Sequence, residues 1–215
     1  VVNSYIFDFG DTKESKFPQY STSFTSELTN HCGTAAGINV LGYFDRIHTN
    51  LIEDFIPIDS QGYRSIETES NDEVLLGNIM IDLSTLMNLN FITPGILPGD
   101  FKTGLSDYTP DDYVVTYVST YTHTSPKHSV LLLSDVPLII VALSFALTDN
   151  TMINEINFNV YHGGHYMVAY GYEKIKYTKS DNSEVINEYL VVNTGWSSGY
   201  KHLLISSTDY PMPTS

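Results

Sequence analysis

Residues 30–37 read NHCGTAAG and contain Cys32, the only cysteine of this 215-residue chain. A thiol followed by a run of small residues is typical of a helix that begins at the cysteine. The N-terminal end of a helix carries about half a positive charge, which favours the thiolate over the thiol. Taken alone, a cysteine is more often a small buried hydrophobic residue. A catalytic role for Cys32 therefore requires a histidine base and a residue that orients it.

Two later segments supply such residues. Residues 164–172 (GHYMVAYGY) place His165 at the head of a short apolar strand. Residues 189–196 (YLVVNTGW) form a second apolar strand that ends at Asn193. Cys32 precedes His165 by 133 residues, and His165 precedes Asn193 by 28. A cysteine followed by a histidine and an asparagine about 130–150 residues downstream is the order found in papain-like enzymes.

The chain resembles the papain-fold cysteine peptidases, and most closely the bacterial C39-like group. Residues 32–36 (CGTAA) are similar to that group's Cys-Gly-Pro-Thr-Ala helix start, without the proline. Residues 164–172 resemble the histidine strand, including the glycine six places after the histidine. Residues 192–196 (VNTGW) resemble the strand that ends in Asn-Ser-Trp, with the tryptophan displaced by one place. Residues 135–143 (DVPLIIVAL) resemble the strand that precedes the histidine strand.

This resemblance implies an α+β fold of the papain-like, two-lobe kind. A helical N-terminal half and an antiparallel β-sheet in the C-terminal half would flank the cleft that holds the active site. The chain would then be a single catalytic domain, with a helical lobe over about 30–112 and a β lobe over about 113–215. The N-terminal segment is a candidate further part of the β lobe.

The resemblance also implies the chemistry. Cys32 would attack a peptide carbonyl as a thiolate paired with His165, and a thioester acyl-enzyme would form. His165 would then protonate the leaving amine and later activate water. Asn193 would hold the imidazole in the useful tautomer, and Trp196 could shield that hydrogen bond. The plainer interpretation of Asn193 is a turn residue that ends a strand, and the plainer interpretation of Trp196 is an ordinary core residue.

The chain departs from the family at the oxyanion hole. Papain-like enzymes carry a glutamine about six residues before the cysteine, where this chain has Ser26, and the nearest glutamine is Gln19. Ser26, Asn30 or a backbone amide are the alternative donors. Loss of one such donor costs on the order of 10²–10³ in rate. Three functions therefore stay open: a cysteine peptidase, another Cys-His acyltransferase or amidase on the same scaffold, and a catalytically inactive binding module.

Composition limits the partners. The formal net charge is −15, from 25 acidic and 10 basic residues. Such a chain is a poor match for nucleic acid or for anionic membranes. The longest apolar run, residues 130–147, is divided by Asp135 and Pro137 into strand-sized pieces, so we expect no membrane insertion. We expect a monomer that acts on a peptide or protein substrate.

The sequence also bears on location and on bound groups. The chain begins Val1-Val2-Asn3 without a basic region, so we expect no signal peptide in it. Few cysteines with many Tyr, Thr, Ser and Asn residues fit an exported bacterial protein at the cell surface or outside the cell. His162 with His165, and the acidic residues at 107, 111 and 112, lack the ligand sets of zinc or EF-hand calcium sites. We therefore expect no metal and no cofactor.

Periodicity predicts the helices. Apolar residues recur at three- and four-residue spacing from Cys32 to about Asn50, as one helical face requires. A second helix is predicted over 71–90, although it contains Gly77. The many prolines and glycines of residues 93–112 predict a long turn-rich connection. Strands are predicted at 4–9, 113–121, 136–147, 165–174, 188–193 and 199–206.

Overall fold

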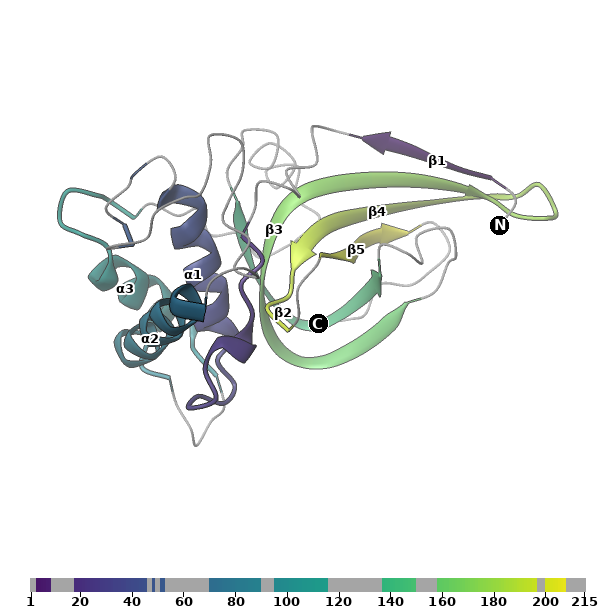
Figure 1. Cartoon of the computed structure of the whole chain (residues 1–215). Coiled ribbons are helices and arrows are strands. Elements are labelled where there is room, and N and C mark those ends of the chain that lie inside the picture. Colours follow the sequence, from purple (N-terminus) through teal and green to yellow (C-terminus); the bar gives the residue numbers. More distant parts are fainter. Residues whose placement is uncertain are drawn as a thin grey trace. The chain divides into compact units, whose positions relative to one another are not determined.

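The computed structural model describes residues 3–8, 18–45, 48, 51–52, 70–89, 95–115, 137–149, 158–196 and 200–207. Over these ranges the chain is α+β, with helices and one antiparallel sheet (Figure 1). It divides into two compact units. The β unit consists of Val1–Glu14, Thr120–Asn193 and Tyr200–Ser215, and the helical unit consists of Ser15–Ser119 and Thr194–Gly199.

The two predicted helices are present, and both end earlier than expected. Helix α1 spans Cys32–Asp45, and His48 already lies in a bend. Helix α2 spans Ser70–Leu86. The chain leaves the helix at Asn88, whose φ of 50° lies in the left-handed region, which asparagine adopts more readily than most residues.

The end of α2 has the hydrogen bonds of a Schellman motif. The Leu89 N–H donates to the Ser84 carbonyl at 2.9 Å, and the Asn88 N–H donates to the Thr85 carbonyl at 3.1 Å. These bonds satisfy carbonyl groups that a helix end otherwise leaves without partners.

Helix α1 is buried along almost its whole length. Twelve of its fourteen residues are buried. Its glycines lie where neighbouring side chains approach the backbone most closely. A Cβ added to Gly33 would lie 2.8 Å from Ile96 Cδ1, and one added to Gly42 would lie 2.7 Å from the ring of Tyr20. The small residues of the sequence motif therefore allow close packing inside the helical unit.

The expected turn-rich connection at 93–112 is wrong, because it contains helix α3, Pro98–Tyr108. Pro98 stands at the first helical position, where its missing N–H costs nothing and its fixed φ suits the helix. Gly95 precedes the helix and Pro110 follows it, so the helix breakers bracket the element. A short 3-10 helix, η2 (Thr22–Phe24), completes the described helices.

Five strands form the sheet in the order β1-β3-β2-β5-β4, and β3 also pairs with β4. Their bounds are Asn3–Asp8 (β1), Leu138–Asp149 (β2), Asn159–Thr178 (β3), Glu184–Asn193 (β4) and Lys201–Ser207 (β5). All pairs are antiparallel. Because β3 pairs with both β2 and β4, and β5 joins these two, the last four strands form a closed cycle of pairings (Figure 1).

Most predicted strands are confirmed; β3 and β4 are longer than expected, and β2 begins and ends two residues later than expected. The N-terminal strand pairs with β3, so this segment belongs to the sheet. The strand predicted at 113–121 is wrong over residues 113–115, which are not extended in a sheet; residues 116–121 lie outside the described part. Val114 is 87% exposed, so no buried face supports the alternation there.

The β unit has two clusters of buried side chains, which follow the alternation of the strands. One contains Ile140, Phe145, Leu147, Met167, Ala169, Leu190, Val192, Leu203 and Ile205. The other contains Ala146, Ile175, Tyr177, Val185, Tyr189 and Leu204. Register shifts between Ala142 and Ser144 and between Ala169 and Gly171 mark irregularities in this alternation.

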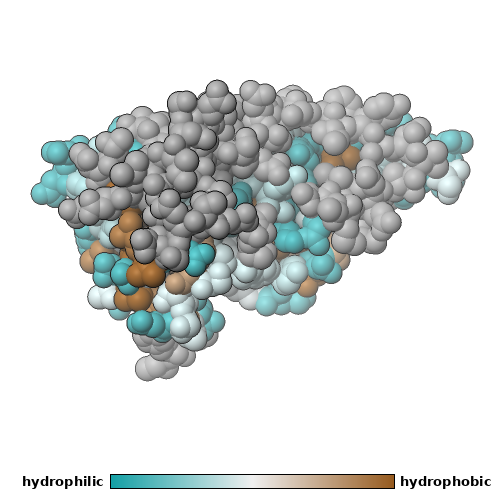
Figure 2. All heavy atoms as spheres, viewed as in Figure 1, coloured by the Kyte–Doolittle hydropathy of each residue, from teal (hydrophilic) through white to brown (hydrophobic). Residues whose placement is uncertain are grey.

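In the helical unit, Figure 2 shows hydrophobic surface over α2 and α3 on the face in view. The large apolar side chains exposed in this region are Val74, Leu86 and Leu97. None of the described helices combines the length and the apolar character needed to cross a bilayer.

The packing of α3 against the end of α2 generates a first prediction. A Cβ at Gly104 would lie 2.6 Å from the backbone nitrogen of Met87, whereas a Cβ at Gly99 would meet nothing within 4 Å. We expect Gly104→Ala to lower the free energy of unfolding by about 1–3 kcal/mol through overpacking. Gly99→Ala, in the same helix, should be neutral or raise it by up to about 1 kcal/mol. Urea denaturation of both variants measures the difference, and equal stabilities would contradict this packing.

Asp45, the last residue of α1, is fully buried. Its Oδ1 accepts a hydrogen bond from the Ile52 N–H at 2.9 Å, while its Oδ2 is buried without a hydrogen-bond partner. Burial raises the pKa of the Asp45 carboxyl, against the backbone N–H groups of Ile52 and Leu51, which lower it. The folded protein therefore holds a proton on this carboxyl more tightly than the unfolded chain does.

The raised pKa of Asp45 fixes how the stability of the protein should depend on pH. A raised pKa in the folded state means that the contribution of Asp45 to stability is greatest in acid and is lost as pH rises through the folded pKa. We expect Asp45→Asn, which removes the buried charge and keeps the acceptor for Ile52, to raise stability at pH 7 relative to the wild type. The gain should shrink as pH is lowered toward 4. Urea unfolding at several pH values measures it, and a gain that grows in acid would contradict the assignment.

Candidate active site

Cys32 lies in the first turn of α1 and is partly exposed. The Ala35 N–H donates to the His31 carbonyl at 3.1 Å, and the Thr34 hydroxyl donates to the same carbonyl at 2.8 Å. His31 is thus the residue that caps the start of the helix, and the N–H groups before Ala35 have no acceptor within the helix. The positive end of the helix dipole lies at the cysteine, which favours a negative sulfur and a negative oxygen beside it.

A loop from far down the chain packs on this same turn. Gly195 has a φ of 72°, and a Cβ added there would lie 3.1 Å from Ala35 Cβ. The Gly195 carbonyl accepts from the Thr22 N–H at 2.7 Å and from the Ser21 hydroxyl at 3.3 Å. Residues 194–196, which follow Asn193 directly in the sequence, are therefore part of the surroundings of the Cys32 helix.

His31 joins these two segments from inside the helical unit. It is 7% exposed, and its Nε2 lies 2.9 Å from the Thr22 carbonyl oxygen. Its Nδ1 is buried without a hydrogen-bond partner. No spacing rule in the sequence points to the contact of His31 with Thr22, nine residues before it.

The candidate oxyanion donors differ in their surroundings. Ser26 and Asn30 are exposed, and Asn30 has a φ of 56°. Gln19 precedes Tyr20, whose N–H and carbonyl both bind the Asn39 side chain at 2.9 Å. Asn39 is seven residues beyond Cys32, or about 10 Å along the helix. The backbone N–H groups in the first turn of α1 are the remaining candidate donors in this unit.

Asn39 is a structural residue that sequence reasoning missed. It is buried inside α1, and its amide also donates to the Ala35 carbonyl at 2.7 Å. Its contacts with Tyr20 fix the segment before η2 alongside the helix. A polar residue in an otherwise apolar helical face was the one signal in the sequence.

His165 lies on β3 in the β unit. It is buried, it stands opposite Ala142 of β2, and its ring stacks on Phe145 with centroids 5.8 Å apart. The β2 backbone shifts register beside this position, between Ala142 and Ser144. The imidazole therefore has a fixed aromatic neighbour, which restricts the orientation of its ring.

Asn193 is the last residue of β4 and is buried. It stands opposite Val168, three residues beyond His165 on the paired strand, or about 10 Å along it. In a regular antiparallel pair Asn193 would share a face with Val168, and His165 would share a face with Met167. A contact between the two side chains therefore requires Asn193 to depart from regular alternation where β4 ends.

The predicted residues thus fall into two pairs. Cys32 and Trp196 belong to the helical unit, and His165 and Asn193 belong to the β unit. Trp196 is 43% exposed, so it is not the ordinary core residue of the plainer interpretation. Its N–H donates to the Thr194 hydroxyl at 3.4 Å.

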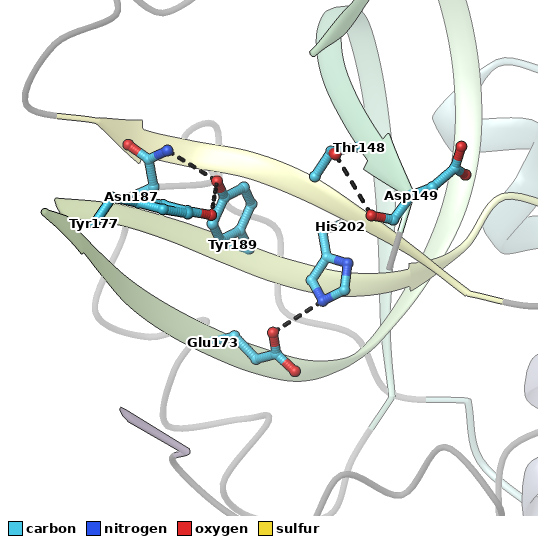
Figure 3. Close-up of polar contacts among 7 residues, drawn as sticks. All are labelled: Thr148, Asp149, Glu173, Tyr177, Asn187, Tyr189 and His202. Atoms are coloured by element: carbon cyan, nitrogen blue, oxygen red, sulfur yellow. Dashed lines mark hydrogen bonds and ion pairs between the residues drawn. The ribbon is translucent and has the colours of Figure 1, made fainter. Parts of the chain in front are cut away.

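The β unit also holds a buried polar cluster that the sequence did not indicate (Figure 3). His202 Nε2 lies 2.9 Å from Glu173 Oε2. The hydroxyls of Tyr177 and Tyr189 are 3.0 Å apart, and Asn187 donates to Tyr189 at 2.8 Å. Burial, the Tyr189 hydrogen bond and nearby negative charge raise the pKa of Tyr177. Because these side chains are buried, we assign them to the structure of the sheet.

In the part of the chain that the structure describes, no group of three or more His, Cys, Asp or Glu side chains is placed to hold a metal ion. Comparison with protein-family models, with curated proteins and with solved structures finds no match. The chemistry of the site therefore has to be argued from the residues themselves.

The loop on the Cys32 helix generates a prediction about Gly195. An alanine there must adopt a positive φ, which costs about 1–2 kcal/mol, and its Cβ would crowd Ala35. We expect Gly195→Ala to lower the stability of the protein by at least that amount. Gly164→Ala is the matched control, because a Cβ there meets only Leu143 at 3.8 Å. Urea unfolding followed by the fluorescence of Trp196, the only tryptophan, measures both; equal effects would contradict the loop's placement.

Proposed function

We propose that the protein is a thiol-dependent hydrolase that cleaves peptide bonds with Cys32 as nucleophile, His165 as base and Asn193 as the residue that orients His165. One observation carries the proposal: the only thiol of the chain is partly exposed at the head of a buried helix, with the segment that follows Asn193 packed on that same turn. The proposal assigns the helical unit and the β unit to the two lobes of a papain-like fold.

The surroundings of Cys32 suit a nucleophile. The helix dipole lowers the free energy of the thiolate relative to the thiol, and a neighbouring imidazolium would lower it further. The sulfur attacks the carbonyl carbon of the substrate, and the negative oxygen that forms is bound by backbone N–H groups of the first turn. Such donors need no glutamine, so Ser26 at the family's glutamine position is compatible with activity.

His165 acts twice in the proposed reaction. As an imidazolium it protonates the leaving amine when the tetrahedral intermediate collapses to the thioester. As a neutral base it then takes a proton from the water that attacks the thioester, and the acid product leaves with the thiolate restored. Stacking on Phe145 supports this role, because it limits rotation of the ring during both proton transfers.

In this proposal the substrate is a peptide or protein, and the protein acts outside the cell or at the cell surface. An acidic protein with a net charge of −15 repels phosphate polymers but not a peptide backbone. One observation favours a second candidate, an inactive binding module: the two side chains expected as alternative oxyanion donors, Ser26 and Asn30, are both exposed.

Turnover of a peptide library tests the proposal. We expect Cys32→Ala and His165→Ala each to lower kcat/KM by at least about 10³-fold, and the double variant to be little worse than either, because the two groups act as one unit. Folding of each variant is checked by urea denaturation. Products that carry an added amine in place of water would instead indicate the acyltransferase.

The reactivity of the thiol separates the enzyme from the binding module. A thiolate–imidazolium pair should alkylate at a rate that is already high at pH 6–7 and that falls in His165→Ala. A rate that rises only through about pH 8.5, as for an ordinary thiol, would contradict the proposed pair. Because the chain has a single cysteine, incorporation of the label reports Cys32 alone.

A further inference from the structure

The backbone of His31 binds the first turn of α1, whereas its side chain binds the segment around Thr22. Its carbonyl accepts from Ala35 N–H and from the Thr34 hydroxyl, and so fixes the first turn of the helix that carries Cys32. Its imidazole binds the Thr22 carbonyl, and the N–H of that same Thr22 donates to the Gly195 carbonyl. One buried residue thus connects the turn with the thiol to the loop with Trp196.

The chemistry of the contact fixes the imidazole. A carbonyl oxygen only accepts hydrogen bonds, so His31 Nε2 must carry the hydrogen that it shares with Thr22. Nδ1 is buried without a partner, so the ring has one attachment point and that point is the peptide group of Thr22. The carbonyl and the N–H of Thr22 belong to two adjacent peptide groups that share the Thr22 Cα. The bond to His31 and the 2.7 Å bond to Gly195 therefore together fix the backbone of Thr22 between the two segments.

We propose that His31 is a positioning residue of the site: through Thr22 and Gly195 it fixes the Trp196 loop relative to the Cys32 turn, and it couples the state of the sulfur to that loop. This inference rests on the proposed function for its effect on turnover, but the coupling itself is a property of the helical unit. The Ser21 hydroxyl, which also donates to the Gly195 carbonyl at 3.3 Å, gives the loop a second and longer attachment.

Two probes in the natural sequence make the coupling measurable without a substrate. Cys32 is the only cysteine and Trp196 is the only tryptophan. Alkylation of Cys32 with a bulky maleimide is expected to shift the emission of Trp196, whose ring is partly exposed. His31→Leu roughly preserves the volume of the side chain but removes its hydrogen bond to the Thr22 carbonyl. The shift of the Trp196 emission should therefore disappear in this variant. His31→Gln, whose amide N–H can reach the Thr22 carbonyl, should restore it.

Turnover gives the second readout. We expect His31→Leu to lower kcat about tenfold or more with little change in KM, since a displaced loop misplaces the catalytic groups rather than the substrate contacts. His31→Gln should recover most of this loss. His162→Leu is the matched control, because His162 is exposed on β3 and its Nδ1 contacts only Ser144 among the described hydrogen bonds. It should leave both readouts unchanged.

The outcomes are distinct. A Trp196 shift that persists in folded His31→Leu, or one that is absent from the wild type, would overturn the coupling. A folded His31→Gln that behaves like His31→Leu would reduce His31 to a packing residue. If His31→Leu fails to fold, His31→Gln decides alone: retained emission shift and kcat support the proposal, and loss of either overturns it. A wild type that shows the shift but no turnover would sink the proposed function and leave the coupling standing.

Discussion

Close packing around the first two turns of α1 is the constraint on which the helical unit depends. Cys32 begins a helix with twelve buried residues, and its glycines admit Ile96 and Tyr20 to within van der Waals contact of the backbone. Asn39 fixes the segment before η2 to the same helix by two hydrogen bonds with the Tyr20 backbone. A thiol at the end of so constrained a helix has a fixed position, which a nucleophile needs and which a surface cysteine lacks.

The chain returns to the helical unit directly after the strand that ends at Asn193. β4 ends at Asn193, and the next three residues belong to the helical unit, where the Gly195 carbonyl accepts two hydrogen bonds. A single peptide bond thus separates the residue proposed to orient His165 from the loop that packs against the nucleophile's helix. The proposed mechanism uses this continuity, and the contacts of His31 with Thr22 and of Thr22 with Gly195 lie on the helical side of it.

Sequence patterns predicted the elements with a strong period and missed those that depend on context. The helix at Cys32 and the strands through His165 and Asn193 followed from apolar spacing. The sequence does not predict helix α3, because prolines and glycines usually end helices; here Pro98 starts the helix and Gly104 allows its close contact with Met87. The strand expected at Tyr113 had the alternation but no buried face. His31 and Asn39 act through backbone groups of distant residues, which no local pattern encodes.

The central claim is that Cys32 and His165 form one reacting pair, and a cross-link tests it most directly. His165→Cys gives the chain a second thiol, and a short reagent with two alkylating groups joins two thiols only where the sulfurs lie within a few ångströms of the reagent's span. His162→Cys, three residues away on the same strand, is the matched control. The account predicts an intramolecular cross-link to position 165 and a much slower one to position 162. A folded His165→Cys protein that forms no such link with Cys32 would contradict it.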